Sequence, residues 1–152
     1  MRLTVIAVGR AGPGPSRDLF ELYARRLTPP LALVEVEERR KLPDAQRRER
    51  EAALLLAAVP KRAVAVALDE HGKTPNSRDF AKMIGAWRDA GAADLAFLIG
   101  GADGHGAAVL ERADATLSLG PMTWPHMLVR PMLAEQLYRA MATLAGHPYH
   151  RG

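Results

Sequence analysis

Four short segments of the chain hold the groups that could do chemistry. They are ALDEHGK (67–73), LIGGADGHG (98–106), LSLGPMTWPH (117–126) and the C-terminal GHPYHRG (146–152). Each of the first three begins in residues typical of a buried strand, and sheets of parallel strands bind ligands beyond their carboxyl ends. These segments therefore predict a ligand site at one edge of a sheet.

The segment 98–106 is suited to close contact between backbone and ligand, because it holds Gly100, Gly101, Gly104 and Gly106. Glycine permits positive φ angles and a close approach of the main chain. The segment is not a dinucleotide fingerprint, since it follows the fourth predicted strand and lacks an acidic residue at the expected distance. A tight turn with no ligand is the alternative interpretation.

The segment 117–126 contains two prolines, Pro121 and Pro125, on either side of Met122, Thr123 and Trp124. Since proline fixes φ, we expect a rigid, extended loop whose N–H and C=O groups point outward. Such groups could hydrogen-bond an adenine ring. The alternative is a simple connector with Trp124 packed on the core.

No metal site or activated nucleophile is predicted. His126, His147 and His150 have no spacing typical of zinc ligands, and cysteine is absent. The chain also lacks a P-loop and a Gly-x-Ser-x-Gly motif.

Length and composition predict one soluble domain over residues 1–152, with 48% hydrophobic and 25% charged residues. No apolar run approaches the roughly 20 residues that span a bilayer, and no signal-peptide pattern is present. The absence of cysteine fits a cytoplasmic protein. The net charge of +4 permits a nucleic-acid partner without requiring one.

Many of the cations fall in one stretch. It contains Arg39, Arg40, Lys41, Arg47, Arg48, Arg50, Lys61 and Arg62. Two interpretations stay open: a surface that contacts phosphates, or a solvated helix face in which Glu49 and Glu51 balance the charge.

Strands and helices alternate along the chain. Apolar runs predict strands near 2–9, 31–37, 63–73, 94–101 and 115–120, and helical spacing predicts helices near 16–27, 43–59, 76–90 and 129–146. Ser16 is the expected N-cap of the first helix, and the last helix is expected to begin near Val129, because Pro131 is tolerated best in a first turn. This order predicts an α/β fold, with a mainly parallel sheet flanked by helices.

The motifs LDEHGK, LIGGADGHG, LSLGPMTWPHMLVR, AEQLYRA and HPYHRG, in this order, resemble those of the RlmH family, the ribosomal large-subunit pseudouridine N3-methyltransferases. The opening RLTVIAVGR fits as well, so the resemblance covers essentially the whole chain. It implies the SPOUT fold, in which the C-terminal part forms a deep trefoil knot, an exception to unknotted topology. It also implies a homodimer that uses S-adenosylmethionine to methylate N3 of a pseudouridine in a 23S rRNA stem-loop, within the assembled ribosome.

The resemblance further implies which residues bind the cofactor. They are Leu68, Gly101, Gly120, Pro121, Met122, Thr123, Trp124 and Pro125. Two positions depart from the family pattern: Gly120 replaces a frequent serine, which removes a hydroxyl, and Pro131 replaces a β-branched residue.

The C-terminal segment is a candidate for the catalytic groups. We hypothesise that it folds over the cofactor site, with His150 as base or proton relay, Arg151 holding a phosphate or the base anion, and Tyr149 positioning the target. In the alternative, Tyr149 and Pro148 only pack the terminus down.

Two other functions remain as alternatives. One is a non-catalytic ribosome-binding or assembly factor that retains the fold, although it would not need both TWPH and PYHRG. The other is an α/β enzyme that uses NAD, which the position of the glycine segment disfavours.

Overall fold

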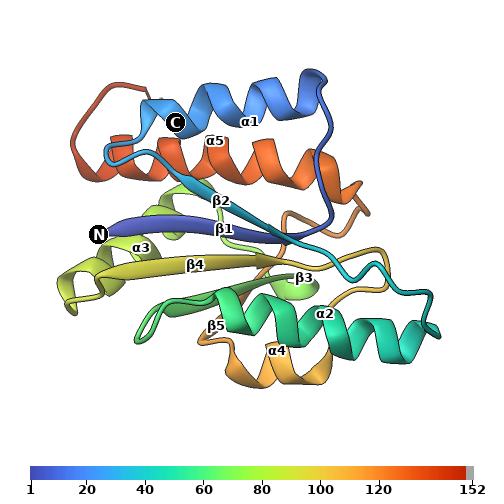
Figure 1. Cartoon of the computed structure of the whole chain (residues 1–152). Helices are drawn as coiled ribbons and strands as arrows, with labels where there is room; N and C mark the ends of the chain where they lie inside the picture. Colours follow the sequence, from blue (N-terminus) through green and yellow to red (C-terminus); the bar gives the residue numbers. More distant parts are fainter. Residues whose placement is uncertain (150–152) are drawn as a thin grey trace.

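A computed structural model describes residues 1–149 of the chain as a three-layer α/β/α arrangement (Figure 1). The strands of the sheet are β1 (Arg2–Val8), β2 (Ala32–Val36), β3 (Val64–Lys73), β4 (Asp94–Ile99) and β5 (Ala115–Leu117). The helices are α1 (Pro15–Arg26), α2 (Asp44–Ala58), α3 (Ser77–Asp89), α4 (Ala107–Arg112) and α5 (His126–Leu144).

The strands form one sheet in the order β2-β1-β4-β3-β5, and each neighbouring pair is parallel. The predicted α/β fold with a mainly parallel sheet is therefore confirmed. The strands β4, β3 and β5 lie next to one another, so their carboxyl ends meet at one edge. The trefoil knot is implied by the resemblance.

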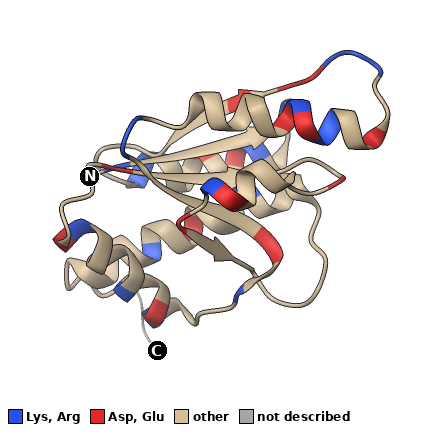
Figure 2. Cartoon of the chain, turned by 90° about the horizontal axis from the view of Figure 1, so that it is seen from below, with Lys and Arg blue, Asp and Glu red and all other residues tan. Residues whose placement is uncertain are grey.

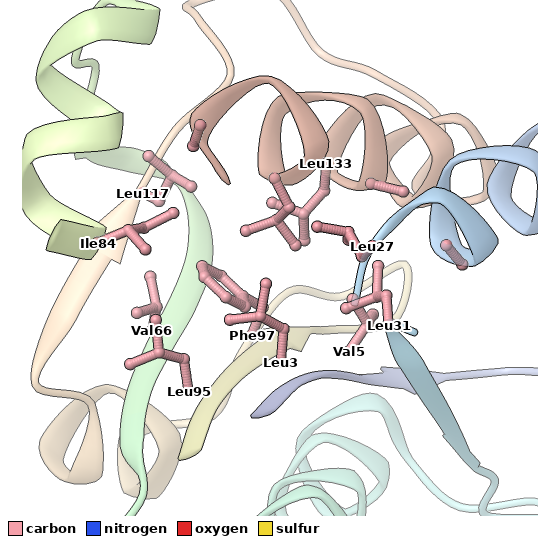
Figure 3. Close-up of a cluster of buried hydrophobic side chains, with 14 of the residues drawn as sticks. Leu3, Val5, Leu27, Leu31, Val66, Ile84, Leu95, Phe97, Leu117 and Leu133 are labelled. Carbon is pink, nitrogen blue, oxygen red and sulfur yellow. The ribbon is translucent and has the colours of Figure 1, made fainter. Parts of the chain in front are cut away.

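Both faces of the sheet are buried. Helices α1, α3 and α5 cover one face, where Phe97 and Leu95 of β4 and Val66 of β3 pack against Ile84 and Leu133 (Figure 3). Helices α2 and α4 cover the other face, where Leu55 of α2 and Val109 of α4 pack with Ile6 and small alanine side chains of the strands. Burial on both faces explains why the strands appear in the sequence as continuous apolar runs.

Helix α5 begins earlier than the sequence predicts. Its first turn forms at His126, where the N–H groups of Leu128 and Val129 donate to the carbonyl of Pro125 over 2.9 and 3.1 Å. The expected start near Val129 is therefore wrong, and Pro131 lies buried inside the helix, where it cannot donate to the carbonyl of Met127. Apolar packing holds Pro131 in place despite this missing bond.

Two further differences lie at helix ends. Ser16 is not the N-cap of α1, because the helix begins at Pro15, a residue suited to a first helical position. Helix α4 was not predicted from the sequence, since its six residues are too few to show a helical period. Within residues 1–149, no helix combines the length and hydropathy required to cross a bilayer.

Candidate active site

A cleft of about 350 Å³ opens at the carboxyl edge of the sheet, a size suited to a small-molecule ligand. Its walls come from the ends of β3, β4 and β5 and from the start of α5. They include Leu68, Asp69, Glu70, Ile99, Gly100, Gly101, Asp103, His105, Ser118, Gly120, Met122, Thr123, Trp124 and His126. The three segments selected by their sequence thus meet in one cleft.

The glycine segment forms a tight turn at the floor of the cleft. The N–H of Gly104 donates to the carbonyl of Gly101 over 3.0 Å, and Gly104 has a φ of 77°. A Cβ atom on Gly101 would lie 3.1 Å from a carboxylate oxygen of Glu51 in α2. Gly101 therefore lacks a side chain for two reasons: it lines the cleft, and Glu51 lies directly behind it.

Helix α2 supports this turn through two charged side chains. Arg47 donates to the Asp103 carboxylate over 2.8 Å and also pairs with Asp44. Glu51 is buried, and its burial raises the pKa of its carboxyl, although the charge of Arg47 acts in the opposite direction. The glycine turn is thereby fixed to α2 as well as to β4.

His105 lies beneath the turn. Its Nε2 is 3.1 Å from the carbonyl of Leu98 in β4, and burial lowers the pKa of the imidazole. The side chain is therefore neutral near pH 7.

The proline segment forms the opposite wall. Ser118 Oγ donates to the carbonyl of Gly120 over 3.0 Å and accepts the Gly120 N–H over 3.2 Å. Gly120 has a φ of 115°, a conformation that favours glycine over serine. Beyond it, Met122 and Trp124 are 71% and 40% exposed, so Trp124 does not pack in the core but lines the cleft.

The beginning of α5 is anchored by a buried arginine. Arg130 is 2% exposed; it pairs with Glu35 of β2 over 2.6 Å and donates to the carbonyl of Gly9, just beyond β1, over 2.9 Å. Burial acts to raise the pKa of Glu35, but hydrogen bonds from Arg130 and from the Ala11 N–H outweigh it, and the pKa is lowered. This network joins the proline segment, through α5, to the carboxyl ends of β1 and β2.

Of the eight residues expected to bind the cofactor, six line the cleft. These are Leu68, Gly101, Gly120, Met122, Thr123 and Trp124. Pro121 and Pro125 do not line it but belong to the same wall, and Pro125 lies immediately before α5.

Tyr149 lies outside the cleft of its own chain. Its hydroxyl donates to Glu135 over 3.1 Å, and its ring meets Tyr138 edge-on, with ring centroids 4.6 Å apart. The pKa of Tyr149 is raised, first by burial and then by its hydrogen bonds. His150 and Arg151, the other two catalytic candidates, lie outside the described residues.

Several polar residues that line the cleft were not among the predicted site residues. They are Asp69, Glu70, Asp103, His105, Ser118 and His126. All six lie within the three segments selected from the sequence. Their place at the ends of predicted strands is the only sequence feature that could have identified them. Which of them faces a common space depends on strand order.

The basic stretch does not form one surface. Helix α2 separates the loop with Arg39, Arg40 and Lys41 from the turn with Lys61 and Arg62, so the two groups lie at opposite ends of this helix (Figure 2). Several of these cations are also paired internally. Glu38 accepts hydrogen bonds from Arg40 and Arg50, and these hold its pKa at about 2.

The buried position of Glu51 removes it from the solvated face on which it was expected to balance charge. Within the cleft itself, Asp69, Glu70 and Asp103 contribute negative charge, and no lysine or arginine is among the residues that line it in the described chain. Residues 1–149 also contain no group of three or more ligand-type side chains placed to hold a metal ion.

Comparison with known proteins identifies the family to which the chain belongs. The model for predicted SPOUT methyltransferases matches residues 1–150. The chain is 62% identical to the ribosomal RNA large subunit methyltransferase H of Paramagnetospirillum magneticum and 60% identical to that of Rhodospirillum centenum, each over 151 residues that cover 99% of both chains. The protein of the same name from Rhodospirillum rubrum is 56% identical over 99% of both chains. Together with the parallel sheet and the cleft at its carboxyl edge, these matches show that the chain belongs to the SPOUT methyltransferase family, among the RlmH proteins.

Proposed function

We propose that this protein transfers a methyl group from S-adenosylmethionine to N3 of a pseudouridine in a 23S rRNA stem-loop, and that it acts on the assembled ribosome. The membership in the RlmH group supports methyl transfer to large-subunit rRNA. The observation that carries the choice of cofactor is the cleft. Its walls combine close backbone approach with carboxylates, and within residues 1–149 they contain no lysine or arginine.

The charge of the cleft distinguishes between two cofactors. S-adenosylmethionine contains a sulfonium cation, which the carboxylates of Asp69 and Glu70 would attract. The pyrophosphate of NAD would be repelled by the same groups, and it would find no cation among the described lining residues to balance its charge. The carboxylate of Asp103 contributes less, because Arg47 pairs with it.

The residues of this chain fit the proposed cofactor. The glycine turn and the segment Gly120–Pro125 would hold it, mainly through backbone groups and the flanks of Met122 and Trp124. When bound, S-adenosylmethionine supplies an electrophilic methyl group. The protein must then keep this group about 3 Å from N3 and exclude water, which two walls anchored to separate helices are suited to do.

The acceptor nitrogen must lose its proton. As the N–C bond forms at N3, the sulfur–methyl bond breaks and the N3 proton passes to a base. We assign this step to the C-terminal segment: His150 accepts or relays the proton, Arg151 stabilises the anion or a phosphate, and Tyr149 positions the target. Since Tyr149 lies outside the cleft of its own chain, the tail would serve the cleft of a partner subunit or would move on binding RNA.

A homodimer fits this arrangement. Three large apolar side chains are 40–44% exposed on the neighbouring helices α1 and α5: Leu19, Leu22 and Leu128. Burial of such side chains against a second copy would stabilise a dimer. The ribosomal substrate would place the protein in the cytoplasm.

Transfer of labelled methyl tests the proposal directly. The substrates are ribosomes that lack the modification, separate subunits and naked rRNA, each incubated with protein and labelled S-adenosylmethionine. We expect incorporation at a single pseudouridine in assembled ribosomes. Cofactor binding with no transfer to any substrate would instead favour the non-catalytic ribosome-binding factor.

A further inference from the structure

His105 is a histidine of the described lining whose ring is hydrogen-bonded to the sheet. Its Nε2 lies 3.1 Å from the Leu98 carbonyl, whereas Nδ1 is buried and has no hydrogen-bond partner among the described residues. A Cβ atom on Gly100 would lie 3.2 Å from this Nδ1. The ring therefore lies directly beneath the glycine turn.

This geometry determines the tautomer. A carbonyl only accepts, so Nε2 must carry the hydrogen and donate it to Leu98. The neutral ring then leaves a lone pair on Nδ1, which is buried and has no hydrogen-bond partner among the described residues. A backbone contact with Leu68 of β3 acts to raise the pKa of the ring, but the effect of burial is larger. The lowered pKa of His105 agrees with this state, burial being its main cause.

We propose that His105 is a positioning residue for methyl-donor binding: its neutral Nε2–H tautomer holds the glycine turn against β4 and keeps positive charge away from the floor of the cleft. This inference rests on the proposed function. A protonated ring would add a cation beneath a site that must accept a sulfonium, and the two positive charges would repel each other.

Charged and titratable side chains approach the His105 ring or its turn from several neighbouring elements. Asp69 of β3 and Asp103 of the turn contribute negative charge, Arg48 and Glu51 approach the turn from α2, and His126 lines the same cleft at the start of α5. The backbone groups that act on the ring belong to Leu98 of β4 and Leu68 of β3, and no carboxylate among the described residues hydrogen-bonds it. Because His126 lines the same cleft, the effect of His105 is measured as a difference between variants.

The test compares His105→Gln with His105→Leu. A glutamine amide can donate to the Leu98 carbonyl but cannot become charged, whereas leucine fills the space without a donor. Affinities for S-adenosylmethionine and S-adenosylhomocysteine, whose sulfur is neutral, are measured from pH 7.5 to 5.5. His147→Gln is the matched control, because His147 is exposed and lies outside the cleft.

At pH 7.5 we expect His105→Leu to weaken S-adenosylmethionine binding about tenfold and His105→Gln to stay within about threefold of wild type. As the pH falls, wild type should lose affinity for S-adenosylmethionine more steeply than for S-adenosylhomocysteine. The difference between these two losses should be smaller in His105→Gln. Equal binding by wild type and His105→Leu would overturn the proposal.

Nitrogen NMR of the wild-type imidazole gives a measurement that needs no variant. We expect a neutral ring at pH 7 with hydrogen on Nε2, and a hydrogen on Nδ1 or a charged ring would contradict the inference. If wild type binds neither nucleoside, the proposed cofactor itself is wrong. Binding by wild type together with unchanged binding by both variants would refute only the role of His105.

Discussion

Gly101 shows how a single position satisfies two neighbours at once. On one side it lines the cleft, and on the other a Cβ atom would meet both carboxylate oxygens of Glu51 at 3.1 and 3.2 Å and Val8 at 3.2 Å. The buried Glu51 has little room to move. The absence of a side chain at residue 101 is therefore a requirement of packing on the side that faces α2.

We expect Gly101→Ala to weaken S-adenosylmethionine binding on the order of tenfold, because the turn must shift by a few tenths of an ångström toward the cleft. The unfolding free energy should fall by about 1–2 kcal/mol. Calorimetric titration and urea denaturation measure the two effects. Gly12→Ala is the control, since a Cβ atom there meets nothing within 4 Å, and an equal effect of both substitutions would contradict the argument.

At the scale of elements, helix α5 depends on contacts with β1 and β2. Arg130 reaches Glu35 and the carbonyls of Val8 and Gly9, so one side chain joins three elements behind the cleft. This anchor offsets the hydrogen bond that Pro131 cannot make. The wall formed by 120–125 is held at its far end by this network.

The pairing of Glu35 makes this anchor sensitive to acid. Its folded-state pKa is lowered, so the stability it contributes is fully present above the ordinary value of 4.5 and is lost as the pH falls through the folded-state value. We expect Glu35→Gln to lower the unfolding free energy by roughly 2 kcal/mol at pH 7, because Arg130 loses its charged partner.

Urea denaturation from pH 7 to 3 tests this expectation. The difference between wild type and Glu35→Gln should shrink below pH 4.5, as the wild-type carboxyl becomes protonated. Glu111→Gln is the control, because Glu111 is exposed and belongs to α4, which lies on the face of the sheet opposite α5. A difference that stays constant down to pH 3 would show that charge at Glu35 is unimportant.

At the scale of the whole molecule, the tail and the cleft are separate in one chain. Tyr149 packs against Tyr138 and Glu135 of α5, and none of these three residues lines the cleft. A catalytic role for the tail therefore requires a second subunit or a rearrangement on the ribosome.

Deletion of residues 149–152 should abolish methyl transfer while S-adenosylmethionine affinity stays within about threefold of wild type, because the deleted groups act on the acceptor rather than on the donor. Tyr149→Phe, which keeps the ring but removes its hydroxyl, shows how much of the loss belongs to that hydroxyl. Single-turnover transfer and calorimetric titration separate the two quantities. Retained turnover in the deletion variant would refute the catalytic role.

Charge also acts at this scale, because the edge that carries the cleft must approach RNA. Lys41 is exposed in the loop before α2, and Lys61 is exposed at the opposite end of the helix. We expect Lys41→Glu to weaken ribosome binding several-fold, most strongly at low salt, and Lys61→Glu to have a smaller effect. Neither should alter cofactor affinity, and an equal loss in both would argue against a contact specific to this edge.

The sequence by itself determined the alternation of strands and helices and the three segments that carry the site. These features are local: apolar runs, helical spacing, and glycine or proline at turns act within a few residues. Helix ends were less well predicted, because α5 begins at His126 through backbone hydrogen bonds to the Pro125 carbonyl, which its proline content conceals.

Only the tertiary structure decided which residues share a space. The order β2-β1-β4-β3-β5 places the ends of β3, β4 and β5 side by side, and it brings Glu51 behind Gly101 and Glu35 to Arg130. It also divides the basic stretch between two edges and places Tyr149 outside the cleft. These relations join residues far apart in the chain, so they depend on the packing of whole elements, which no local pattern encodes.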